Sequence, residues 1–151
     1  KSFIEQGVQP CGLGARDSLR LEAGMLLCGQ DIDISTNPFE AGLAWLVNLD
    51  RGDFIGRTSL LSTRRRGVRR RLVGFQMSGR EIARSGYRIF KFSEEVGRVT
   101  SGGYAPTLGV NIGLGYVPTE LATIGNDIKI MIRNKPVPAH IVNKRFYKRG
   151  V

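Results

Sequence analysis

The sequence predicts an α+β protein whose second half is a small antiparallel β-barrel or jelly roll. Three observations support this fold class. In residues 72–142, apolar residues recur at every second position in six short segments, as expected for half-buried strands. Turn-forming residues separate these segments without intervening helical patterns, which is typical of small all-β units. Residues 1–63 instead show short helical spacings interrupted by glycine and proline.

The first part of the chain predicts two helical features. The opening KSFIEQG reads as the last turn of a helix with a glycine C-cap, and because no methionine precedes it we expect a fragment or processed product. Residues 12–31, GLGARDSLRLEAGMLLCGQD, predict an amphipathic helix. Its buried face would carry Leu19, Ala23 and Leu26, which lie at helical spacing.

A further helix is predicted from Pro38 to about Val47. Asn37 is a good N-cap, proline suits the first helical position, and Glu40 can complete a capping box. The apolar stripe of this helix would comprise Phe39, Leu43, Leu46 and Val47. Residues 50–53 then predict a turn, and residues 54–63 a short strand end followed by a short helix.

The second half predicts strands at 72–77, 87–90, 96–101, 110–117, 128–133 and 137–142. The clearest hairpin is IKIMIRNKPVPAHIV, with Lys135 and Pro136 near its tip. The arginine-rich run RRRGVRRR, residues 64–71, predicts a linker between two compositional halves. The expected organisation is therefore a first domain over 1–63, a linker over 64–71 and a barrel domain over 72–151.

The net charge of +10 is unevenly distributed. Residues 1–63 hold five Lys+Arg and eight Asp+Glu, whereas residues 64–151 hold eighteen and five, a net charge of +13. A basic half can bind nucleic acid, an acidic protein or an anionic ligand, although a solvated charged face is the more common outcome. No apolar run approaches the roughly 18 residues of a membrane helix. The presence of only two cysteines predicts a reducing, cytoplasmic location. Two cysteines and one histidine that is remote in sequence do not predict a metal site.

Two residues are the best candidates for a binding site. Arg16 offers a planar cationic fork that suits a carboxylate or the edge of a heterocycle, but an ion pair with Asp17 or Glu22 is the more common role. Asp17 can also reach Arg20 across one turn. Trp45 follows small residues that leave room for a flat ligand, whereas burial against a neighbouring element is the more common outcome for a tryptophan.

Other catalytic patterns are weaker. Asp17 and Glu22 do not face each other on one helix, so an acid–base pair is poorly supported. Ser18 has no local base, and His140 is remote in sequence. The glycines complete no phosphate-binding motif. The closing KRFYKR could contact RNA, but a basic segment with two aromatics is not a specific signal.

Six motifs occur in one order: GLGARDSLRLEAGMLLCGQD, NPFEAGLAW, DFIGR, GRVTSGGYAPTLG, IGLGYVP and KRFYKRG. Together they resemble the aminomethyltransferase family, the T-proteins of the glycine cleavage system. The resemblance covers essentially all 151 residues and corresponds to the C-terminal portion of the family's usual chain, roughly two-fifths of it. It implies that the first part is the end of a folate-binding α+β domain.

Members of this family transfer the aminomethyl carbon from the lipoylated H-protein to tetrahydrofolate, giving methylenetetrahydrofolate and ammonia. The resemblance implies that Arg16 and Trp45 line the folate site and that the catalytic aspartate lies outside this chain, which alone should be inactive. The family's closing motif usually has a proline that is missing between Arg145 and Phe146, so no C-terminal site residue is carried over. We expect no membrane partner and do not expect nucleic acid to be the partner.

Two alternatives belong to other classes. The chain could be the folate-accepting domain of a sarcosine- or dimethylglycine-type oxidoreductase, which an upstream flavin-binding domain would indicate. It could also be a non-catalytic basic module that binds RNA. Steep salt dependence of RNA binding, without folate binding, would favour that second alternative.

Overall fold

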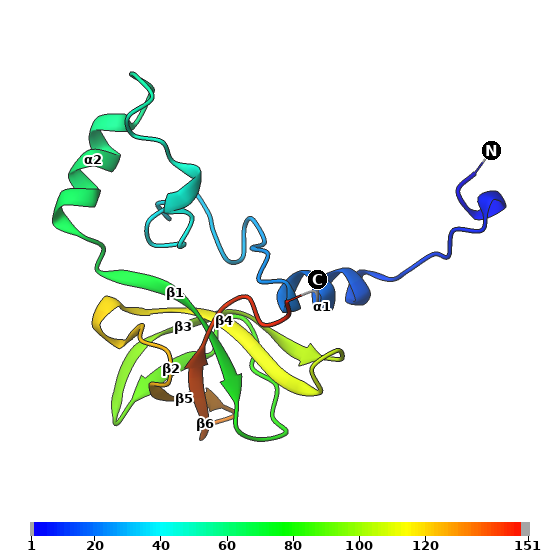
Figure 1. Ribbon diagram of the computed structural model, residues 1–151. Coiled ribbons are helices and arrows are strands. Elements are labelled where there is room, and N and C mark those ends of the chain that lie inside the picture. The colour runs from blue at the N-terminus through cyan, green and yellow to red at the C-terminus, as the bar shows by residue number, and fades with distance from the viewer. Residues whose placement is uncertain (1, 149–151) are drawn as a thin grey trace.

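A computed structural model describes residues 2–148 and shows the predicted α+β fold. Six strands form a closed antiparallel barrel, and the short helix α1 and the C-terminal tail lie against one outer face of it (Figure 1). The segment before α1 and the helix α2 extend away from the barrel in the same view. None of the helices in the described residues is long and apolar enough to cross a membrane.

The barrel consists of β1 (Arg70–Met77), β2 (Arg88–Lys91), β3 (Glu94–Ala105), β4 (Val110–Pro118), β5 (Asp127–Ile132) and β6 (Lys135–Val142). Their order is β1-β4-β3-β2-β5-β6, and pairing of β6 with β1 closes the barrel. All six predicted strands are confirmed, and of the two predicted architectures the barrel is correct. The β5–β6 hairpin turns at Arg133 and Asn134, whose φ angles of 47° and 64° match the two-residue turns that favour right-twisted hairpins.

Strand β4 is buried on both faces, which explains its sequence IGLGYV. Its glycines face the barrel interior, where larger side chains from other strands need the room. A Cβ on Gly115 would lie 2.7 Å from the Cδ1 of Ile89, and one on Gly113 would lie 2.8 Å from the Cε2 of Phe75. Phe75 and Ile89 are both fully buried in the barrel core. Period-two alternation here therefore separates two apolar cores rather than a core and solvent.

Helix α1, Leu13–Glu22, packs on the outside of β3 and β4. Leu21, which is 2% exposed, joins an outer apolar cluster. The strand residues of that cluster are Leu72, Ala105, Ile112, Leu114 and Tyr116. The predicted buried face is wrong at Leu19, which is 63% exposed. The helix ends at Glu22 with Ala23 as its C-cap, and Leu26 lies beyond the helix but packs against the same outer cluster.

The predicted helix from Pro38 to Val47 is also wrong. Asn37 does cap a turn, because its Oδ1 accepts hydrogen bonds from the backbone N–H groups of Phe39 and Glu40, both at 3.0 Å. Only one turn forms, since Gly42 takes a left-handed conformation with φ 69°, which ends helical propagation. A separate 3₁₀ turn, η2 (Ala44–Leu46), follows it.

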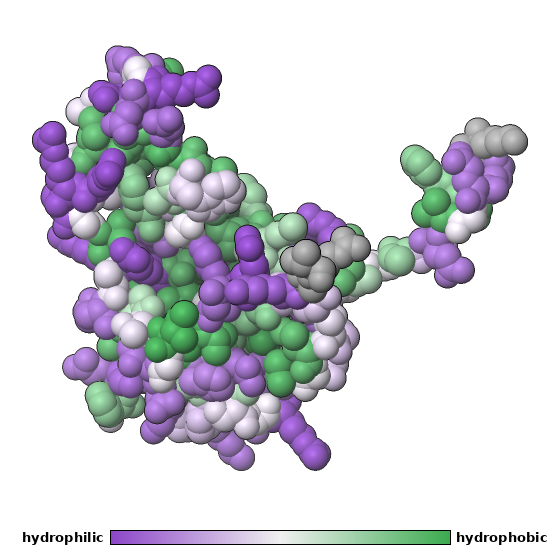
Figure 2. All heavy atoms as spheres, in the orientation of Figure 1, coloured by the Kyte–Doolittle hydropathy of each residue, from purple (hydrophilic) through white to green (hydrophobic). Residues whose placement is uncertain are grey.

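The remaining elements are short. η1 (Ile4–Gln6) ends at Gly7 in the left-handed region, as predicted for the C-cap, and η3 (Thr119–Leu121) follows β4. α2 (Arg57–Arg66) buries none of its residues, and residues 54–56 form a turn rather than the predicted strand end. The arginine-rich run is divided between the last turn of α2 and the start of β1. Figure 2 shows green hydrophobic residues at the surface of the upper part of the molecule, beside purple hydrophilic ones.

Candidate functional site

The buried carboxylate of Asp31 joins the N-terminal segment to the barrel. Its side chain is fully buried and accepts four hydrogen bonds. The donors are Arg20 Nη1 at 2.6 Å and Leu27 N at 2.9 Å to Oδ2, and Thr100 Oγ1 and Ser101 Oγ, both at 2.6 Å, to Oδ1. A buried charge needs this degree of pairing to be tolerated. The network therefore fixes α1 and the loop after it against β3.

A groove of about 690 Å³ lies beside this network, between the end of α1, the loop at residues 42–45 and the C-terminal tail. Its lining combines apolar and aromatic side chains with cationic ones. The side chains that give it this character are Met25, Leu43 and Trp45, and Lys144, Arg145 and Lys148. An apolar groove with a few convergent charges is the usual form of a small-molecule site. A flat aromatic ligand with an anionic tail would match both the apolar and the cationic side chains of this lining.

Trp45 is presented to this groove rather than buried. It is 77% exposed and lies in the middle of η2. The turn before η2 is held by Leu43 N donating to the carbonyl of Pro38 at 2.7 Å. An exposed indole over a groove can stack against a planar ring. The proposal that a flat ligand lies over Trp45 stays a prediction, and the helix on which the sequence placed this residue is absent.

Arg16 lies in the first turn of α1, away from this groove. It is exposed, and among the described residues its guanidinium makes no ion pair or hydrogen bond. The ion pair considered for it is instead made by Arg20, which binds Asp17 at 2.7 Å and Asp31 at 2.6 Å. Arg16 is not among the residues that line the groove of Trp45. The two predicted site residues are therefore not brought together by residues 2–148.

The weaker catalytic candidates stay apart. Glu22 is buried and accepts a hydrogen bond from Thr107 N at 2.9 Å, whereas Asp17 pairs with Arg20 on the surface. The hydroxyl of Ser18 donates to the carbonyl of Gly14 at 2.9 Å. His140 lies in β6 opposite Asp127 and Gln76. Within residues 2–148 no cluster of His, Cys, Asp and Glu side chains could hold a metal ion.

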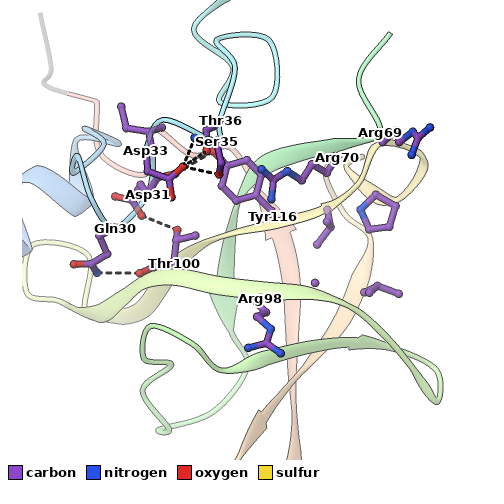
Figure 3. A pocket seen from close by; sticks show the side chains of 15 residues that line it. Gln30, Asp31, Asp33, Ser35, Thr36, Arg69, Arg70, Arg98, Thr100 and Tyr116 are labelled. Carbon is purple, nitrogen blue, oxygen red and sulfur yellow. Dashed lines mark hydrogen bonds between the residues drawn. The ribbon is translucent and has the colours of Figure 1, made fainter. Parts of the chain in front are cut away.

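A second pocket, of about 360 Å³, separates the loop after α1 from the barrel rim (Figure 3). The guanidinium of Arg70 lies 4.7 Å from the ring centre of Tyr116, and its Nε lies 3.3 Å from Glu40 Oε2. Hydrogen bonds from the hydroxyl and backbone N–H of Ser35 hold the pKa of Asp33 below its usual value. Burial raises the pKa of Tyr116. Three of the charged residues that line this pocket, Asp31, Arg70 and Arg98, make ion pairs within the protein.

Sequence reasoning missed the cationic residues that line the Trp45 groove. The basic residues of KRFYKR were visible, but sequence alone does not show that the tail returns to the end of α1. The backbone N–H of Tyr147 donates to the carbonyl of Glu22 at 2.8 Å, and Phe146 packs on the outer apolar cluster. The adjacent aromatic pair Phe146 and Tyr147 within the basic motif is the local signal of this docking, because large aromatic side chains favour packed positions.

This fold defines a class: a closed six-stranded antiparallel barrel with a preceding segment that packs on its outer face. The glycine cleavage T-protein C-terminal barrel domain matches residues 70–148, and the GCVT N-terminal domain matches residues 3–51. The chain therefore belongs to the glycine cleavage T-protein family, the aminomethyltransferases.

Individual relatives agree with this assignment. An aminomethyltransferase from Nostoc sp. is 54% identical over 98% of this chain, and one from Thermosynechococcus vestitus is 50% identical over 99%. The crystal structure of the glycine cleavage system aminomethyltransferase T from Bartonella henselae superposes with a TM-score of 0.90 at 33% identity, over 95% of this chain. The chain spans about 40% of the length of these curated relatives and 41% of that crystallised chain.

Proposed function

We propose that this chain supplies one side of the tetrahydrofolate site of an aminomethyltransferase. The complete enzyme would transfer the aminomethyl carbon from lipoylated H-protein to tetrahydrofolate, giving methylenetetrahydrofolate and ammonia. The observation that carries the proposal is the exposed indole of Trp45 in a groove that cationic side chains also line. The shared family of this chain and its aminomethyltransferase relatives supports the same reaction.

The groove fits a folate in size and chemistry. Its volume of about 690 Å³ is in the range of pockets that hold drug-sized ligands. Trp45 would stack on a planar ring of the cofactor, while Arg145 and Lys148 would bind the carboxylates of its glutamyl tail. Tetrahydrofolate, when bound, supplies the amine nitrogens that accept the one-carbon unit.

Arg16 is proposed as a second folate contact. Its guanidinium faces solvent and has no partner among the described residues, so it is available to an anionic or electron-rich group. Because it lies outside the Trp45 groove, it would contact a different part of the ligand. We also propose that the catalytic aspartate belongs to the additional length of the family's chain, so that residues 1–151 alone do not turn over substrate.

Fluorescence of the single tryptophan tests the proposal directly. Trp45 is the one tryptophan of the chain, so its emission reports the groove alone. Tetrahydrofolate, kept reduced, should quench this emission saturably, and Arg145→Gln should weaken the affinity several-fold. Lys129→Gln, which removes the same charge from β5, is the matched control and should bind as the unchanged chain does. Saturable binding that neither quenches Trp45 nor responds to Arg145 would overturn the placement.

Activity needs the complete enzyme and forms the second part of the test. The first 60% of the Nostoc relative, joined to this chain, would supply the family's missing length. The fusion should transfer the aminomethyl group to tetrahydrofolate, whereas the chain alone should not. Arg16→Ala and Trp45→Ala in the fusion should raise the KM for tetrahydrofolate. Turnover by the chain alone would contradict the proposed position of the catalytic group.

The lipoylated H-protein is the proposed partner, and the arginine-rich run at 64–71 is its proposed docking surface. Three of these arginines lie in the last turn of α2 and two begin β1, all on exposed positions. Such a cluster would steer an acidic protein at low ionic strength. Reversing the charge of Arg69–Arg71 should weaken H-protein binding at low salt, and unchanged affinity would exclude this surface. The cytoplasmic location stays a prediction.

A further inference from the structure

One residue of the C-terminal tail, Lys144, occupies a slot between three glycines from separate elements. A Cβ on Gly24, just after α1, would meet the carbonyl oxygen of Lys144, and one on Gly42 would meet its Nζ. A Cβ on Gly74, in β1, would lie 2.6 Å from the Cα of Lys144. Gly24 and Gly42 also have left-handed φ angles, but Gly74 does not. The absence of a side chain at Gly74 is therefore explained by the passage of the tail.

The ammonium group of Lys144 holds the turn that precedes Trp45. Its Nζ donates to the carbonyl of Ala41 at 2.7 Å and lies 3.4 Å from that of Gly42. Among residues 2–148 no carboxylate lies within ion-pair distance of it. This half-buried lysine donates to two carbonyls rather than to a carboxylate, so its charge stabilises the backbone of the turn. Charged donors make the stronger hydrogen bonds.

This clamp acts on the residues that present the indole. Gly42 lies three positions before Trp45, and the turn and η2 are joined by the hydrogen bond from Leu46 N to the carbonyl of Leu43 at 3.0 Å. The contact between Lys144 and Ala41 spans 103 positions of sequence. It is thus a long-range tie on a loop whose other hydrogen bonds are mostly local. Lys144 also lines the groove itself.

We propose that Lys144 is a positioning residue for the ligand groove, which clamps the Ala41–Gly42 turn and thereby sets the orientation of Trp45. Docking of the C-terminal tail then both completes the lining of the groove and fixes the turn that carries Trp45. The clamp is a property of the ligand-free protein. Its consequence for tetrahydrofolate affinity rests on the proposed function.

The test begins without ligand. Lys144→Met keeps the length of the side chain but removes its donors, and it should lower the fluorescence anisotropy of Trp45. Lys144→Arg keeps donors and should restore the anisotropy of the unchanged protein. Lys148→Met is the matched control, because Lys148 lines the same groove but makes no hydrogen bond to the turn. It should leave the anisotropy unchanged.

Ligand titration then separates the two proposals. Lys144→Met should weaken tetrahydrofolate binding by up to about tenfold, because the ligand would then have to order a turn that has lost a charge-assisted hydrogen bond. Lys148→Met should weaken binding less. Lack of tetrahydrofolate binding by the unchanged protein would refute the proposed function while the anisotropy result still decides the clamp. Equal anisotropy in folded Lys144→Met and unchanged protein would overturn the clamp.

A second variant covers the case in which Lys144→Met does not fold, as judged by far-ultraviolet circular dichroism. Gly74→Ala retains the lysine at position 144, but the new Cβ forces the backbone of Lys144 away from β1. It should lower the anisotropy of Trp45 in the same way. Unchanged anisotropy in Gly74→Ala would then count against the clamp.

Discussion

The barrel and the segment before it are stabilised by different means. Of the buried apolar residues, only Leu21, Ala41 and Leu49 come from the described residues before 67, whereas the others belong to the barrel and its loops. In the earlier segment, large side chains such as Ile34 and Ile55 are fully exposed. The barrel therefore has its own core, and the segment does not.

This difference shows how the candidate site is supported. The segment that carries Arg16 and Trp45 is attached to the barrel by a few specific contacts: the Arg20–Asp31 pair, the Leu21 side chain and the Lys144 clamp. A segment without its own core takes its conformation from what it binds. Perturbing these contacts should release the segment and leave the barrel folded.

The largest effect is expected from Asp31→Asn. The amide cannot satisfy the donors that converge on both carboxylate oxygens, and it leaves Arg20 without its buried partner. Breaking a buried pair from one side costs about 3–5 kcal/mol. Hydrogen exchange should accelerate in α1 and in residues 25–33 while β5 and β6 stay protected.

Asp33→Asn is the matched control for this prediction. Asp33 lies two positions further on, is exposed and binds only its own turn among the described residues. It should change exchange in α1 little. Equal acceleration in both variants, or loss of protection throughout the barrel with Asp31→Asn, would show that the two regions do not differ as described.

Leu21→Ala should have the next largest effect. Leu21 is 2% exposed in the outer cluster, and truncation of a buried leucine costs about 2–5 kcal/mol. Leu19→Ala removes the same atoms from a side chain that is 63% exposed and should be nearly neutral. Urea unfolding of both variants measures the difference. Similar losses for the two would restore the predicted buried face of α1.

Gly115→Ala tests the barrel itself. The new Cβ would lie 2.7 Å from Ile89 Cδ1 and 2.8 Å from the carbonyl oxygen of Arg98, and overpacking of this kind costs about 1–3 kcal/mol. Gly103→Ala, on the neighbouring strand, would meet only Leu21 Cδ2 at 3.7 Å. Thermal unfolding should show a lower Tm for the first variant alone. Equal Tm values would mean that β4 does not need glycine toward the core.

The strands were predictable because each carries its own periodic signal. Alternation in β1, β4 and β6 is imposed by a core that every strand of a barrel faces, so local sequence suffices. Barrel closure and the strand order required tertiary contacts. In β4, the glycines that alternate with large residues were visible, but the second core outside them depends on α1.

The periodic spacing of apolar residues did not predict the end of the Pro38 turn or the buried face of α1. Both lie in the segment without its own core, where single glycines and single tertiary contacts decide the conformation. Gly42 ends the first turn after Asn37, and the Arg20–Asp31 pair and Leu21 orient α1. Of the candidate site, Trp45 was predicted from its small neighbours, whereas Lys144 could not be predicted without knowing that the tail returns to the end of α1.

The smallest effect is expected from Tyr116→Phe, at the boundary between the two regions. The hydroxyl of Tyr116 donates to the carbonyl of Asp31 at 3.0 Å, and loss of one such bond costs about 1 kcal/mol. Burial raises the pKa of Tyr116 above its ordinary value of 10.0. The neutral phenol therefore stabilises the fold fully below pH 10.0, and this contribution is lost as the pH rises through the raised pKa.

The difference in unfolding free energy between the unchanged protein and Tyr116→Phe should accordingly be constant near neutral pH and shrink above pH 10.0. The difference in phenolate absorbance between the two proteins should show one tyrosine titrating above that pH. A stability difference that grows with pH would mean that the phenolate is the favoured form, as a neighbouring cation such as Arg70 would cause. The boundary would then be held by charge rather than by the hydrogen bond to the loop of Asp31.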